Sequence, residues 1–192
     1  ESQIYDSGYL MLHGSNYAVQ HFVISNGNES AKNTIGLLEC LRGYLHCGSK
    51  NVFGSNPNPI RLGGPYETKE WRINVFDLNG FDQTATTLFS KANKDGHPAI
   101  VEADGEKFVT EVTSAEPAML SRRVKQSANL TYGFKFTGKA GFQKDFADDV
   151  VFVNHISDSK GELKVNAGSL TLAQDAGWGG GTVKVTGGKL VC

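Results

Sequence analysis

The C-terminal stretch GSLTLAQDAGWGGGTVKVTGGKLVC, Gly168–Cys192, decides the predicted fold. It consists of short runs in which apolar and polar residues alternate, and glycines separate the runs. Alternation with a period of two places the apolar side chains of a run on one face of a β-strand. Glycine lets the backbone bend sharply between two such strands without a Cβ penalty. The stretch therefore predicts short strands joined by tight turns.

An internal repeat extends this prediction to a fold class. Gly161–Leu172 aligns with Gly181–Cys192 at an offset of 20 residues, and both follow the pattern G-x-Φ-x-Φ-x-x-G-x-Φ-x-Φ, in which Φ is apolar. A third copy lies at Gly36–Cys47. One such coil cannot bury its apolar face alone, whereas stacked coils share a continuous core. The repeat therefore predicts an all-β solenoid with coils of about 20 residues.

The remaining segments also favour strands. β-branched and aromatic residues gather at Ala18–Ile24, Trp71–Phe76 and Asp149–Val153. Ser30–Leu41 overlaps a repeat copy, which favours a strand over a helix. Glu116–Gln126 is compatible with either.

Composition limits the function classes. The 192 residues carry a net charge of −1, so neither a nucleic-acid partner nor a basic membrane-binding segment is indicated. No apolar run approaches the ~20 residues that a membrane span needs. Because the chain begins at Glu1 and no domain boundary is evident, we expect residues 1–192 to be a single solenoid segment of a longer secreted protein.

Two motifs resemble a known family. Gly168–Val191 resembles the autotransporter-associated β-strand repeat in passenger domains of secreted bacterial surface proteins: GSLTL at Gly168–Leu172 is followed by Trp178, glycines, and Thr182-Val183. Upstream, FDLNGFDQT at Phe76–Thr84 resembles the DLNGFNQT stretch that often precedes the repeat. The resemblance implies a right-handed parallel β-helix that is exported and displayed at the cell surface. We expect the chain to have no catalytic activity and no cofactor.

The three cysteines allow two interpretations. Cys40, Cys47 and Cys192 all fall on Φ positions of the repeat, which favours small core residues. A Cys40–Cys47 disulfide is the alternative, since an oxidising compartment permits it and the two residues follow on consecutive strands of one coil. The C-x6-C spacing without a second ligand pair does not indicate a metal site.

A polysaccharide-cleaving β-helix is the main enzymatic alternative, with its site in the irregular middle of the chain, 57–118. Asp148 and Asp149 are candidate paired carboxylates, and His97 lies in a Gly-His-Pro sequence. Adjacent side chains on a strand point to opposite faces, which opposes joint acid–base work by the two aspartates. We therefore interpret Asp148, Asp149 and His97 as solvated turn residues.

The other polar residues predict no site. His13, His21, His46, His97 and His155 form no ligand-spaced pair, so we expect them to be scattered over the polar face, and we predict no metal and no cofactor. Tyr66 and Trp178 are the candidate ligand contacts, because aromatic rings in loops supply a large contact area at small entropic cost.

The sequence thus leads to three functional hypotheses. The first is an extracellular structural or adhesive solenoid that contacts glycans or host and cell-surface proteins. The second is a polysaccharide lyase or glycoside hydrolase. The third is a self-associating filament or shell subunit, since the open ends of a solenoid can template stacking.

Overall fold

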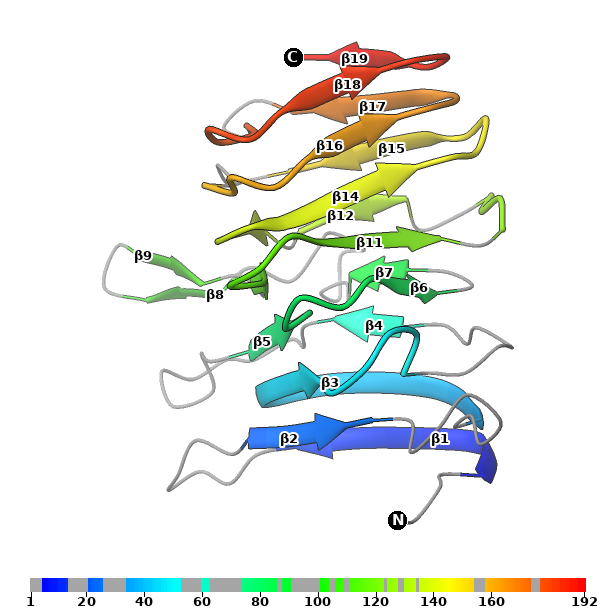
Figure 1. The fold of residues 1–192 in the computed structure, drawn as a ribbon, viewed down its shortest axis with the longest axis vertical. Coiled ribbons are helices and arrows are strands. Elements are labelled where there is room, and N and C mark those ends of the chain that lie inside the picture. The colour runs from blue at the N-terminus through cyan, green and yellow to red at the C-terminus, as the bar shows by residue number, and fades with distance from the viewer. Residues whose placement is uncertain are drawn as a thin grey trace.

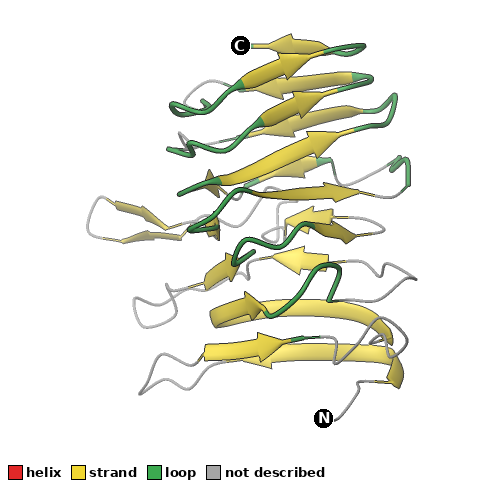
Figure 2. Ribbon diagram, viewed as in Figure 1, coloured by secondary structure: helices red, strands yellow, loops and turns green. Residues whose placement is uncertain are grey.

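The computed structural model of the chain is a parallel β-solenoid. Its coils stack along the long axis of the molecule, with the N-terminus at one end and the C-terminus at the other (Figure 1). Among the described residues the regular structure is strand, without a helix (Figure 2), so no helix there could cross a membrane. The structure describes residues 5–13, 21–25, 34–52, 60–62, 74–85, 88–90, 101–103, 106–108, 111–122, 124–127, 130–133, 135–153, 158–173 and 177–192. The all-β solenoid prediction is confirmed.

The strands form three parallel sheets and one hairpin. The eight-stranded sheet contains β1 (Tyr5–His13), β2 (His21–Ile24), β3 (Thr34–Cys47), β4 (Ile60–Leu62), β5 (Asn74–Asp77), β7 (Leu88–Ser90), β10 (Glu111–Thr113) and β13 (Lys135–Phe136). The five-stranded sheet contains β6 (Gln83–Ala85), β11 (Ala118–Arg122), β14 (Ala140–Lys144), β16 (Leu163–Val165) and β18 (Val183–Val185). The four-stranded sheet contains β12 (Thr131–Tyr132), β15 (Asp149–Phe152), β17 (Ser169–Leu172) and β19 (Lys189–Val191). The antiparallel hairpin of β8 (Val101–Ala103) and β9 (Glu106–Phe108) projects from the side of the stack in Figure 1.

The sequence repeat sets the strand register at the C-terminal end. Leu163 pairs with Val183 and Leu170 with Leu190, at the predicted offset of 20 residues. The period is longer in the middle of the chain, where Gln83 pairs with Leu120. The β8–β9 hairpin lies within that interval, so the longer coil carries an insertion.

The third repeat copy also folds as predicted, with one difference. β3 runs through both halves of the copy as one strand instead of two. It bends at Gly43, which has a φ of 104°, and the equivalent Gly168 of the next copy has a φ of 66°. Both angles lie in the left-handed region that favours glycine, so the repeat places glycine where the coil turns. The ambiguous segment 116–126 contains strand β11.

Inward-facing apolar residues form one core along the stack. Leu45, Phe76, Val112 and Phe136 pair from coil to coil and are fully buried. Four aromatic side chains of the core, one from each of the strands β12 to β15, pack together. They are Tyr132, Phe136, Phe142 and Phe152, and the centroids of their contacting rings lie 5.3–6.4 Å apart. Aromatic pairs at such distances stabilise a core beyond their buried area.

The inner column continues to the C-terminal face of the stack without a cover among the described residues. Val183 and Val185 stack on the buried Leu163 and Val165, yet they are 42% and 46% exposed. The last coil therefore exposes two positions that the coil below it buries as Leu163 and Val165.

Candidate functional site

The stretch 76–84, which carried part of the family resemblance, forms a corner of the solenoid. The Phe81 N–H donates to the Leu78 carbonyl at 2.8 Å, and Asn79 and Gly80 have φ values of 51° and 79°. Two positive φ angles between these hydrogen-bonded residues define a type I′ turn, for which Asn-Gly is the preferred sequence. The Asp77 carboxylate accepts the Asn79 N–H at 2.8 Å and fixes the start of the turn.

Polar side chains of this corner bind the neighbouring coils. Asn79 donates to the Cys47 carbonyl at 3.1 Å, and the Gly80 N–H donates to the Ser114 hydroxyl at 2.9 Å. Gln83 is fully buried; it accepts the Val52 N–H at 3.1 Å and donates to backbone carbonyls. The motif is thus explained by hydrogen bonds that join three coils.

Asp148 and Asp149 point to opposite faces, as the alternation along a strand requires. Asp149 is exposed and accepts a hydrogen bond from Ser169. Asp148 is 6% exposed, so its interpretation as a solvated turn residue is wrong. The sequence could not reveal this burial, because Arg122 and Gln126, two of the partners of Asp148, lie 26 and 22 positions away.

Asp148 belongs to a buried ionic cluster. Its Oδ1 lies 2.7 Å from Nη2 of Arg122 and 3.1 Å from Nζ of Lys144, and all three side chains are at most 3% exposed. Oδ2 accepts the Gln126 N–H at 3.0 Å. Lys144 also donates to the Phe146 and Ala167 carbonyls. The cluster holds two cations and one anion in the solenoid interior.

Burial and hydrogen bonding shift the pKa values of Asp148 and Lys144 in opposite directions. Burial alone would raise the pKa of the Asp148 carboxyl, but hydrogen bonds from Arg122, Gln126 and Lys144 outweigh it and hold that pKa below its ordinary value. Burial lowers the pKa of Lys144, and the hydrogen bond and charge of Asp148 offset part of this effect. Arg122, Lys144 and Asp148 are packed inside the coils, so we assign them a structural role.

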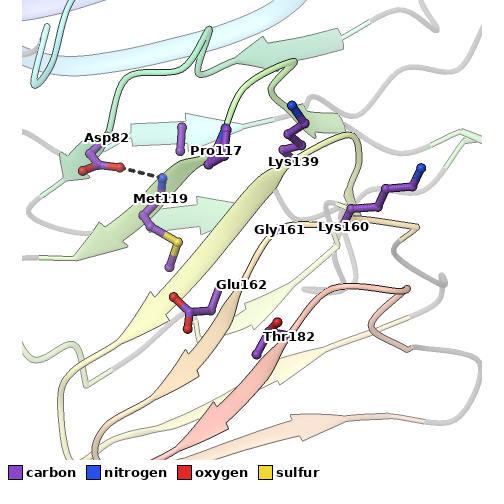
Figure 3. Close-up of a pocket in the computed structure, with 9 residues that line it drawn as sticks. Asp82, Pro117, Met119, Lys139, Lys160, Gly161, Glu162 and Thr182 are labelled. Atoms are coloured by element: carbon purple, nitrogen blue, oxygen red, sulfur yellow. Dashed lines mark hydrogen bonds between the residues drawn. The ribbon is translucent and has the colours of Figure 1, made fainter.

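A groove lies on the outside of the five-stranded sheet. It encloses about 340 Å³. Figure 3 shows Asp82 and Met119 on one side of it and Lys139 and Lys160 on the other. The groove is also lined by Pro117, Ala118, Gly161, Glu162 and Thr182.

Most charges of the groove are already paired. Glu162 lies 2.8 Å from Nζ of Lys164 and 2.6 Å from Nζ of Lys184, and these contacts hold the pKa of its carboxyl below the ordinary value. Lys139 lies 3.1 Å from the Glu116 carboxylate. Lys160 is exposed and has no ion pair within the described ranges. The groove therefore has Lys160, a cation without an ion pair among the described residues, on the side opposite the apolar side chain of Met119 (Figure 3).

The candidate ligand contacts lie in different parts of the structure. Trp178 is half-buried: its Nε1 donates to the Gly161 carbonyl at 3.2 Å, and its ring lies 5.1 Å from that of Phe136. This geometry gives the indole a packing role beside one end of the groove, and its part in ligand binding stays a prediction. Tyr66 lies outside the described residues.

The structure describes the side chains of two of the three cysteines. Cys47 is fully buried with a free thiol, as expected of a core residue. Cys192 also has a free thiol but is exposed, so the core position predicted for it is wrong. Burial raises the pKa of the Cys47 thiol well above its ordinary value, and the nearby Asp77 carboxylate adds to the effect. The side chain of Cys40 lies outside the described part of the chain. His97 is also outside it, so the enzymatic hypothesis for the middle of the chain stays open.

The expectation of scattered histidines is wrong for one pair. Nδ1 of His21 lies 2.9 Å from Nε2 of His46, and Nδ1 of His46 lies 2.8 Å from Oδ2 of Asp77. These residues come from β2, β3 and β5, and they are 25 and 31 positions apart in the sequence. A search for closely spaced ligands misses the pair because coil stacking brings it together. No group of three or more His, Cys, Asp or Glu residues suited to a metal ion lies within the described ranges.

Comparisons with known proteins add no family assignment. No family model matches the chain, and no curated protein or solved structure matches it significantly.

Proposed function

We propose that the chain is a non-catalytic β-solenoid segment of an exported, surface-displayed protein. Its work is to span distance and to present outward-facing side chains to glycans or to host and cell-surface proteins. The proposal also takes up the resemblance to the autotransporter-associated repeat.

The observation that carries the proposal is the unbroken stacking of the C-terminal coils. β14, β16 and β18 pair in register, and so do β15, β17 and β19. Each coil lengthens the stack by one strand spacing of about 4.8 Å and repeats the interface below it. A fold of this kind builds length in proportion to the number of residues, which suits a spacer.

Ordered polar contacts between coils also support a rigid presenting surface. Asn166 donates to Asp145 at 2.7 Å and accepts from Thr186 at 2.7 Å, so three coils are joined on the outer face. Hydrogen-bonded rows of this kind hold outward side chains in fixed positions. The groove is the place on this face where we propose that a ligand binds, with Lys160 attracting carboxylate or sulfate groups of an acidic glycan.

A binding and cleavage assay tests the proposal. The chain is incubated with a panel of acidic and neutral polysaccharides, and retention of the chain and release of reducing or unsaturated ends are measured. We expect salt-sensitive retention on acidic polysaccharides without release of new ends. Replacing Lys139 and Lys160 together by alanine should weaken this retention. Lys189→Ala, at an exposed position of β19, is the matched control. Cleavage, or equal retention of the groove and control variants, would overturn the proposal.

A further inference from the structure

A chain of hydrogen bonds joins two imidazoles and a carboxylate near the N-terminal end of the stack. His21, His46 and Asp77 lie on β2, β3 and β5, which pair as neighbouring parallel strands (Figure 1). The rings of His21 and His46 are nearly parallel, with an interplanar angle of 8°. Tyr44 stacks on His21 with a centroid distance of 4.5 Å and an angle of 11°. The stacking of the coils therefore holds the imidazoles of His21 and His46 side by side.

The carboxylate fixes where the protons lie. Asp77 can only accept a hydrogen bond when ionised, so Nδ1 of His46 carries the proton of that contact. A neutral His46 then has its lone pair on Nε2, which accepts from Nδ1 of His21. His46 thus has the arrangement found in metal-binding histidines, in which one ring nitrogen donates to a carboxylate and the other is left as the ligand.

The distance between the two facing nitrogens suits a metal with tetragonal geometry. Two nitrogens that each lie ~2.05 Å from a metal ion at right angles to one another are ~2.9 Å apart. The observed separation of Nδ1 of His21 and Nε2 of His46 is 2.9 Å. Tetrahedral coordination would need a separation of ~3.3 Å. Square-planar coordination by nitrogen and oxygen is typical of Cu²⁺ and Ni²⁺.

We propose that His21 and His46 form a binding site for a tetragonal divalent metal ion, best suited to Cu²⁺, with Asp77 as the positioning residue and water in the remaining positions. On binding, the His21 proton moves from Nδ1 to Nε2 and the ring turns its Nδ1 lone pair to the metal. A neutral pair therefore binds without net release of a proton. This site lies on the eight-stranded sheet, away from the groove on the five-stranded sheet, so the inference does not rest on the proposed function.

The experiment is a titration of the full chain with Cu²⁺ alone. Cys192 is exposed and its thiol reacts with Cu²⁺, so Cys192→Ser is the background for all variants. Binding is measured by calorimetry, and nitrogen coordination by electron paramagnetic resonance. We expect one Cu²⁺ with hyperfine coupling to two imidazole nitrogens. His21→Gln changes an exposed side chain and should abolish this signal without unfolding the chain.

Two further variants separate positioning from coordination. Asp77→Asn should weaken Cu²⁺ binding by about 10–100-fold while both nitrogens stay coordinated, because the carboxylate acts through His46. His97→Ala is the control and should bind as the background does. If His21→Gln retains the two-nitrogen site, or if only His97→Ala loses it, the proposal is wrong. Circular dichroism of each variant confirms that the solenoid is intact, and the result for His21→Gln decides the outcome if Asp77→Asn unfolds.

Discussion

Replacing Asp148 by asparagine tests the buried ionic cluster. The change leaves Arg122 and Lys144, whose side chains are 1% and 0% exposed, without the carboxylate that pairs with both of them. Removing one partner of a buried ion pair costs ~3–5 kcal/mol, since it leaves an uncompensated buried charge. If the free energy of unfolding falls by ~2 kcal/mol per molar of urea, this loss should lower the urea midpoint of unfolding by about 2 M.

The assay is urea unfolding at pH 7, followed by far-ultraviolet circular dichroism and tryptophan fluorescence. Asp149→Asn is the matched control, because the neighbouring carboxylate is exposed and its loss should change the free energy of unfolding by no more than ~0.5 kcal/mol. Lys144→Met should lower the free energy of unfolding less than Asp148→Asn does. It removes the contact with Asp148 and the donor to two carbonyls, but it leaves a balanced Arg122–Asp148 pair. Equal midpoints for Asp148→Asn and Asp149→Asn would refute the role assigned to the cluster.

Three further predictions follow from burial and charge. Leu170→Asp should unfold the C-terminal coils because it buries an unpaired carboxylate, whereas the half-buried Thr171→Asp should be tolerated; equal damage in thermal melts would contradict the register. The pKa of Asp148 is lowered on folding, so the stability it contributes is present above pH ~4 and is lost as the pH falls through the lower, folded value. Urea midpoints between pH 6 and pH 2 should therefore fall less steeply in Asp148→Asn than in the unmutated chain. Cys47→Ala should lower the free energy of unfolding by ~1–2 kcal/mol, with or without reductant. Iodoacetamide should label Cys192 before Cys47 in the native protein. Loss of stability on reduction of the unmutated chain would instead favour the Cys40–Cys47 disulfide.

The C-terminal half of the fold was predictable because its period is regular. Gly168 and the apolar positions around it recur after 20 residues, so periodicity alone gives the strands, the turn and the inward face. The middle of the chain was less predictable, since insertions such as the β8–β9 hairpin shift the register between coils. Sequence reasoning found the segments there but could not assign Glu116–Gln126 to a strand.

The polar contacts between coils could not be predicted from local sequence. Asp148 is paired in the interior because Arg122 lies on β11, the strand that stacks next to β14, and His21 meets His46 because β2 stacks directly on β3. Each contact depends on how many residues separate successive coils. The Asn79-Gly80 turn, in contrast, is a local signal, and its sequence alone indicates a tight turn.

The central claim is that this chain builds length by stacking coils. Three tandem copies of residues 161–180, inserted between Gly180 and Gly181, test it most directly. The inserted segments repeat β16 and β17, so they should add three coils and lengthen the molecule by about 14 Å at ~4.8 Å per coil. Small-angle X-ray scattering measures the maximum dimension, and circular dichroism should show a proportional gain of strand signal. An unchanged maximum dimension, or an inserted segment that adds no strand signal, would contradict the claim.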